Sequence, residues 1–219
     1  MKAFFISYLL GDIQQVLRRT ISLTLLFSTL SVNTLNSEPP PIVLAFGDSL
    51  TAGFGVAEQE SYPSRLQKIL TQHGHPHQVT NAGVSGDTTA GGLSRIDWLL
   101  KQNPKIVIVE LGANDGLRGL PLSKMYANLD QIIRRCRQAG ARVLLAGMKI
   151  PPNYGDEYTQ EFEDMFHRLA EQYQLNFIPF FLEGVAAKRE YTMEDGIHPL
   201  APGYKIVTET VWRALEPML

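Results

Sequence analysis

Four short polar segments of the chain carry side chains of the types that nucleophilic acyl transfer requires. Ser49, in Gly-Asp-Ser-Leu, could attack a carbonyl carbon with its hydroxyl oxygen. Asp195 precedes His198 by three residues, which lets a carboxylate orient an imidazole within one loop. Gly83 lets a backbone N–H approach a ligand closely, and the Asn114 amide could donate to the same oxygen. Together they supply a nucleophile, two oxyanion donors, and a base with the carboxylate that orients it.

Each segment by itself is also typical of an ordinary turn. The aspartate of a Gly-Asp-Ser turn often satisfies backbone donors, and an asparagine in a loop often does the same. An Asp-x-x-His spacing also occurs in loops and helix caps. A prediction of acyl-transfer chemistry therefore depends on all the segments meeting at one place in the fold.

The elements that must position these segments alternate between two patterns after Pro41. Short apolar runs, such as the Ile-Val-Ile-Val-Glu-Leu run, are typical of strands buried on both faces. Between them, apolar residues recur at helical spacing. The alternation predicts an α/β fold in which helices cover both faces of a parallel sheet of about five strands. Strands are predicted at 42–46, 78–80, 106–111, 143–146 and 177–179, and helices at 62–71, 93–100, 125–137, 157–173 and 204–215.

In open parallel sheets, ligands bind beyond the carboxyl ends of the strands. Ser49, Gly83 and Asn114 each follow a predicted strand, and Asp195 and His198 precede the last predicted helix. We therefore expect all five residues at one edge of the sheet.

The composition excludes several classes of protein. A chain of 219 residues with 44% hydrophobic and 19% charged residues is typical of a folded globular domain. The net charge of −2 disfavours nucleic-acid binding. One cysteine, Cys136, cannot form an internal disulfide or a cysteine-based zinc site. We expect a monomer that acts on a small molecule.

Residues 1–37 differ in character from the rest and are predicted to be a secretory signal or leader, with the folded domain at 38–219. Arg18 and Arg19 precede the apolar run 21–32, which is shorter than the ~18 residues of a membrane-spanning helix. The interpretation is export to the periplasm or outside the cell, without a stable membrane span. A retained leader is the alternative, and a true start near Val16 would explain why the basic pair lies so deep in the chain.

Two other features allow more than one interpretation. His73, His75 and His77 are spaced closely enough for a metal site, but their Gly/Pro-punctuated segment is more typical of a solvated connection. The Ile-Pro-Pro-Asn-Tyr-Gly segment from Ile150 could be a rigid turn or a mobile loop.

The four segments FGDSLTAG, NAGVSGDTT, ELGANDGLRG and DGIHP resemble, in this order, the four sequence blocks of the GDSL or SGNH hydrolases. VELGANDGLRG, IPPNYG and DGIHP are most similar to the periplasmic multifunctional group of acyl-CoA thioesterase I, lysophospholipase and arylesterase. The resemblance implies a flavodoxin-like three-layer α/β/α fold, no metal or cofactor, and a place for the Ile150 segment beside an acyl pocket. It also implies a triad of Ser49, His198 and Asp195, and an oxyanion hole made by the Ser49 N–H, the Gly83 N–H and the Asn114 side chain.

The predicted function is a serine hydrolase that cleaves carboxylic ester and thioester bonds of acyl substrates. Two alternatives stay open. An O-acetyl esterase acting on carbohydrate would need no long apolar groove for its small acyl group. A non-catalytic flavodoxin-like binding module would use the same residues only as turn formers.

Overall fold

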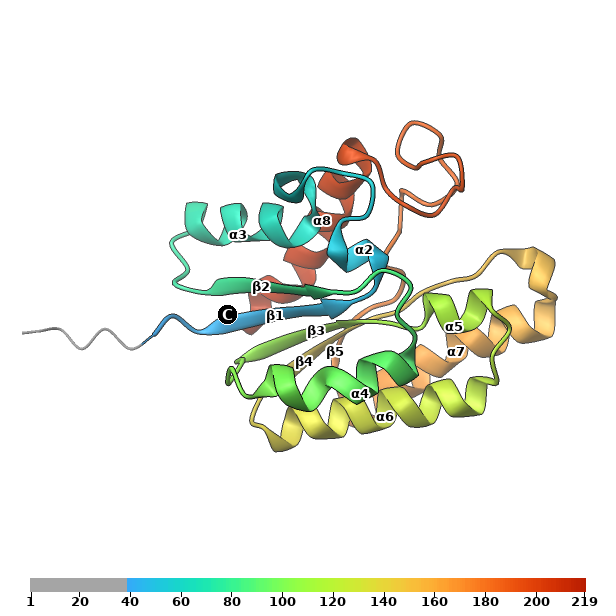
Figure 1. The fold of residues 1–219 in the computed structure, drawn as a ribbon, viewed down its shortest axis with the longest axis horizontal. Helices are drawn as coiled ribbons and strands as arrows, with labels where there is room; N and C mark the ends of the chain where they lie inside the picture. Colours follow the sequence, from blue (N-terminus) through green and yellow to red (C-terminus); the bar gives the residue numbers. More distant parts are fainter. Residues whose placement is uncertain (1–38) are drawn as a thin grey trace, which may run out of the picture. The chain divides into compact units, whose positions relative to one another are not determined.

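The computed structural model describes residues 39–219, so the predicted leader lies outside the described residues. The described chain forms a five-stranded sheet with strand order β2-β1-β3-β4-β5, in which every pair is parallel (Figure 1). This confirms the predicted fold class. The strands are β1 (Ile42–Gly47), β2 (Gln78–Gly83), β3 (Ile106–Glu110), β4 (Arg142–Ala146) and β5 (Asn176–Ile178).

Helices cover both faces of the sheet and give three α/β/α layers. Figure 1 shows α3 and α8 on one face and α4, α6 and α7 on the other. Within residues 39–219, no helix combines the length and apolar character needed to cross a membrane. The helices are α2 (Ser49–Ala52), α3 (Tyr62–Gln72), α4 (Thr89–Leu100), α5 (Ala113–Leu117), α6 (Leu122–Gln138), α7 (Asp156–Tyr173) and α8 (Ala201–Leu215), with short 3₁₀ turns at Glu58–Glu60, Pro152–Tyr154 and Glu216–Met218.

The centre of the sheet is buried, whereas its β2 edge is half-exposed. All five residues of β3 are buried, as its run of β-branched side chains predicts. β2 has no fully buried residue and continues to Gly83, so Gly83 ends the strand instead of following it. Gly47 of β1 pairs with Gly83 on one side and with Glu110 of β3 on the other. The carboxyl ends of these three strands are therefore level with one another.

The predicted start of the last helix, at residue 204, is wrong. α8 begins at Ala201 and includes Pro202 and Gly203. A proline fits the first turn of a helix because its missing N–H has no partner there. A Cβ on Gly203 would lie 2.3 Å from the carbonyl oxygen of Tyr191. This glycine therefore permits close packing and does not mark a helix boundary.

Candidate active site

Ser49 lies in a sharp turn between β1 and α2. The Asp48 side chain caps this turn by accepting a hydrogen bond of 3.0 Å from the Leu50 N–H. Gly47 leaves room for the turn, because a Cβ there would lie 2.1 Å from Thr51 Oγ1. Close packing thus fixes the backbone that carries the Ser49 hydroxyl, and Ser49 itself is only 9% exposed.

The loop before α8 brings an imidazole to the Ser49 hydroxyl. The distance from Ser49 Oγ to His198 Nε2 is 2.9 Å, and His198 Nδ1 lies 2.6 Å from Asp195 Oδ2. The other carboxylate oxygen, Oδ1, accepts hydrogen bonds from the N–H groups of Ile197 (2.8 Å) and His198 (2.9 Å). Partial burial opposes the charge on Asp195, but the His198 side chain and these N–H groups outweigh it and lower the pKa of Asp195. The carboxylate therefore stays ionised below its usual range.

Gly83 and Asn114 reach the same edge of the sheet from the other two strand ends. A Cβ on Gly83 would lie 2.1 Å from the Ala52 nitrogen, so only glycine fits beside the nucleophile turn. The Gly83 N–H donates to Asn81 Oδ1 at 2.9 Å. Asn114 Nδ2 donates to Asp48 Oδ2 at 3.0 Å. The structure thus brings all five predicted site residues together.

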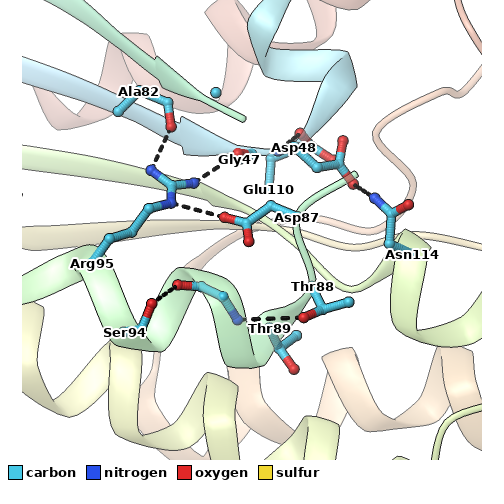
Figure 2. Close-up of polar contacts among 12 residues, drawn as sticks. Gly47, Asp48, Ala82, Asp87, Thr88, Thr89, Ser94, Arg95, Glu110 and Asn114 are labelled. Carbon is cyan, nitrogen blue, oxygen red and sulfur yellow. Dashed lines mark hydrogen bonds and ion pairs between the residues drawn. The ribbon is translucent and has the colours of Figure 1, made fainter. Parts of the chain in front are cut away.

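Arg95 is a supporting residue that the sequence did not indicate. Its guanidinium donates to the carbonyl oxygens of Ala82 (2.7 Å) and Gly47 (2.9 Å) and forms an ion pair of 2.8 Å with Asp87. Figure 2 shows it reaching from α4 to the ends of β1 and β2. It therefore holds together the two strand ends that carry Ser49 and Gly83. No local pattern marks such a residue, because its acceptors are backbone carbonyls of other elements.

Two buried carboxyl groups lie under the nucleophile turn. Glu110 Oε2 accepts hydrogen bonds from Thr51 Oγ1 (2.7 Å) and from the Asp48 N–H (3.3 Å). Glu110 Oε1 has no hydrogen-bond partner among residues 39–219. Burial raises the pKa of both Asp48 and Glu110, and repulsion by the Asp48 carboxylate raises the pKa of Glu110 further. A signal for Glu110 was present, since it is the charged residue in an otherwise apolar buried strand.

An apolar pocket of about 210 Å³ opens beside the site. It reaches the neighbours of two site residues, Ala113 next to Asn114 and Ile197 next to His198. Its other walls include Leu117, Ile150, Pro151 and Phe180. The segment from Ile150 thus lines this pocket.

The three clustered histidines lie in the segment between α3 and β2, at the amino-terminal end of β2. They are therefore at the opposite end of the strands from Ser49. The rings of His73 and His75 pack on Trp212, with centroid distances of 4.8 and 5.9 Å. In the part of the chain that the structure describes, no group of three or more His, Cys, Asp or Glu side chains could hold a metal ion.

The sequence model of the GDSL-like Lipase/Acylhydrolase family matches residues 45–206, which span every one of these site residues. The chain belongs to this family. As a member of the GDSL-like family, it also shares most of its length with several characterised relatives.

An arylesterase of Vibrio mimicus is 42% identical over 198 residues, which cover 90% of this chain and 97% of the relative. Thioesterase 1/protease 1/lysophospholipase L1 of Escherichia coli strain K12 is 34% identical over 88% of this chain and 92% of its own. Among solved structures, that of TesA superposes with a TM-score of 0.79 at 40% identity, over 81% of this chain and 99% of that one. This chain therefore shares its fold with the solved structure of TesA.

Replacing Arg95 by methionine tests its role as a clamp in this GDSL-like protein. The variant keeps an apolar stem but leaves the Gly47 and Ala82 carbonyls without their donor. We expect a loss of about 1–3 kcal/mol in the free energy of unfolding, measured in urea. We also expect turnover to fall about 10-fold or more, because the strand ends can shift. Arg134→Met, at an exposed arginine of α6, is the control. If Arg95→Met and Arg134→Met had equal free energies of unfolding, Arg95 would not hold the two strand ends together.

The buried Glu110 predicts a pH dependence of stability. A carboxyl whose pKa is raised by folding keeps its proton where the unfolded chain has released it. Stability must therefore fall as the pH rises from the ordinary glutamate pKa through the pKa of the folded protein. Glu110→Gln has no proton to release at this position, so the fall should be smaller and limited to the part that Asp48 contributes, whose pKa folding also raises. Unfolding free energies in urea, measured from about pH 4 to about pH 8, test this. The exposed Glu209→Gln is the control, and parallel curves for Glu110→Gln and the unmodified protein would contradict the prediction.

Proposed function

We propose that this chain is a serine hydrolase that cleaves carboxylic ester and thioester bonds of acyl substrates through Ser49, His198 and Asp195. The observation that carries the proposal is the 2.9 Å approach of Ser49 Oγ to His198 Nε2 across 149 residues of sequence. A non-catalytic module that used these residues only as turn formers would have no reason to align a hydroxyl, an imidazole and a carboxylate in series.

The reaction proceeds in two steps. His198 Nε2 takes the proton of the Ser49 hydroxyl as Oγ bonds to the acyl carbon, and the carbonyl electron pair moves to oxygen. When the carbonyl re-forms, the bond to the alcohol or thiol breaks and the leaving atom takes the proton from His198. Water then attacks the acyl-serine with His198 again as base, which releases the acid and restores Ser49. Asp195, kept ionised by its lowered pKa, orients the imidazole and stabilises its charged form.

The oxyanion is held by the Ser49 N–H, the Gly83 N–H and the Asn114 side chain. The Asn114 amide nitrogen has two hydrogens, of which one is bonded to Asp48 and fixes the plane of the amide. The second hydrogen is available to the substrate oxygen. The Gly83 N–H must exchange Asn81 Oδ1 for the substrate oxygen.

Asn114→Ala is expected to lower kcat by about 10²- to 10³-fold with a smaller change in KM, because the oxyanion forms only after attack. Steady-state kinetics with p-nitrophenyl esters measure this. A change confined to KM would instead assign Asn114 to binding of the ground state.

An alkyl chain is the acyl group that best fits the pocket at Ala113 and Ile197. The pocket walls are mainly apolar, as an alkyl chain requires, whereas a pocket that held the sugar of an O-acetylated carbohydrate would need convergent polar groups. The names of the relatives, arylesterase and thioesterase 1/protease 1/lysophospholipase L1, support ester and thioester substrates.

Two measurements test the proposed function. A fluorophosphonate probe should label the unmodified protein and the Ser123→Ala control, at an exposed serine of α6, but not Ser49→Ala. A folded protein that stays unlabelled would favour the non-catalytic module. A chain-length series of p-nitrophenyl and CoA esters should then show activity beyond acetyl. Activity on acetyl esters alone would favour an O-acetyl esterase.

We also propose that the enzyme acts in the periplasm or outside the cell. The support is the basic pair and apolar run in residues 1–37. N-terminal sequencing of the protein recovered from the exported fraction is expected to find these residues removed. An intact leader on cytoplasmic protein would contradict export.

A further inference from the structure

Phe54 contacts the catalytic imidazole but has no part in the mechanism described above. Its ring centroid lies 4.9 Å from that of His198, with the planes tilted by 52°. Phe54 is 50% exposed as a residue, so its side chain contacts His198 and is also open to solvent. The Phe54 N–H donates to the Ser49 carbonyl oxygen at 3.0 Å. The position of the phenyl ring is thus tied to the turn that carries the nucleophile.

The chemistry requires the leaving group to pass beside this ring. In the first step the leaving oxygen or sulfur takes its proton from His198 Nε2, so it must come within hydrogen-bond distance of that atom. The group attached to the leaving atom then lies next to whatever flanks the imidazole. Phe54 is the aromatic side chain that packs on this imidazole in the described residues.

The strand order places Phe54 away from the acyl pocket. The pocket is lined by residues that follow β3, β4 and β5, such as Ala113, Ile150 and Phe180. Phe54 follows β1, and the exposed Val84 follows β2, the strand on the far side of β1. With the order β2-β1-β3-β4-β5, the two apolar side chains and the pocket come from opposite sides of the nucleophile turn.

We propose that Phe54 forms a subsite for the leaving group and favours flat aromatic alcohols. This inference rests on the proposed hydrolase function. A ring on the leaving alcohol would cover the exposed part of Phe54 in a stacked or edge-to-face arrangement. Such a pair should favour an aromatic over a small alkyl leaving group by about 3- to 10-fold.

The experiment compares benzyl acetate with ethyl acetate, which share the acyl group and have leaving alcohols of similar basicity. In Phe54→Ala, the ratio of kcat/KM for benzyl over ethyl acetate should fall by about 3- to 10-fold. Phe54→Leu should give an intermediate ratio, and Phe54→Trp should retain it. Trp98→Ala, at an exposed aromatic on α4, is the control and should leave the ratio unchanged. Because the two rates come from one preparation, the ratio does not depend on how much of a variant is folded.

A second ratio of kcat/KM values tests whether Phe54 affects the acyl side of the site as well as the leaving-group side. The preference for ethyl hexanoate over ethyl acetate should not change in Phe54→Ala, because the acyl pocket is made by other residues. If both ratios fall together, or if both acetates slow equally, Phe54 is not a leaving-group contact and the inference is wrong. If the unmodified protein hydrolyses none of these esters, the proposed function fails and the inference fails with it.

Discussion

Ser49→Ala is expected to lower kcat for p-nitrophenyl esters by about 10⁶-fold, as loss of the nucleophile does in other serine hydrolases. The variant loses the hydroxyl oxygen proposed to form the acyl intermediate, while the oxyanion donors and the apolar pocket stay in place. KM should therefore change little. The substitution removes one oxygen from a side chain that is 9% exposed, so the free energy of unfolding should change only slightly.

A double variant makes this prediction sharper. If Ser49 and His198 act as one unit, Ser49→Ala/His198→Ala should be no slower than Ser49→Ala alone. Additive losses would mean that the imidazole acts on something other than the Ser49 hydroxyl. Ser123→Ala, which removes an exposed hydroxyl on α6, should keep full activity.

Asp195→Asn is expected to lower kcat by about 10³- to 10⁴-fold. An amide cannot stabilise the imidazolium that forms as Ser49 loses its proton, and it can hold His198 in the wrong tautomer. The Asp195 side chain is 42% exposed, so solvent screens part of its charge and we expect no more than this range. Pre-steady-state measurements of p-nitrophenol release should show that acylation and deacylation are both slower, because His198 is the base in each step.

Glu194→Gln is the matched control for Asp195→Asn. It removes the same charge from the adjacent residue of the same loop, and Glu194 is exposed. If the charge of the loop were what matters, both variants would slow the enzyme equally. If orientation of His198 matters, as the 2.6 Å contact to Asp195 suggests, only Asp195→Asn should do so.

The sequence predicts the bounds of the central strands of this fold better than those of the edge strand β2. β1, β3 and β4 lie within one residue of their predicted bounds, because strands buried on both faces read as continuous apolar runs. β2 is three residues longer than predicted, because polar residues are tolerated on its exposed edge. α4 starts at Thr89, four residues early, and its first turns contain Gly91 and Gly92, which are poor helix formers. Gly92 is there for packing, since a Cβ would lie 2.4 Å from Leu111 Cδ1.

Some residues of the candidate site can be predicted from the sequence, and others cannot. Ser49, Asp195 and His198 have side chains that can act as nucleophile, carboxylate and base, and they follow a strand or lie in a loop. The sequence alone therefore predicts them as site residues. Arg95 contacts two backbone carbonyls, and Phe54 contacts an imidazole ring, on elements distant in the sequence. Their side-chain types are ordinary in a helix and after a turn, and only the folded chain shows what they touch.

The apolar pocket and the nucleophile turn are built by different parts of the chain. The pocket walls follow β3, β4 and β5, whereas the hydroxyl is held by β1, β2 and the Arg95 clamp. If this pocket holds the acyl group as proposed, libraries that vary acyl selectivity can be drawn from Leu117, Ile150 and Phe180. Those libraries leave the packing around Gly47 and Gly83 intact, so most of their members should remain folded and reactive.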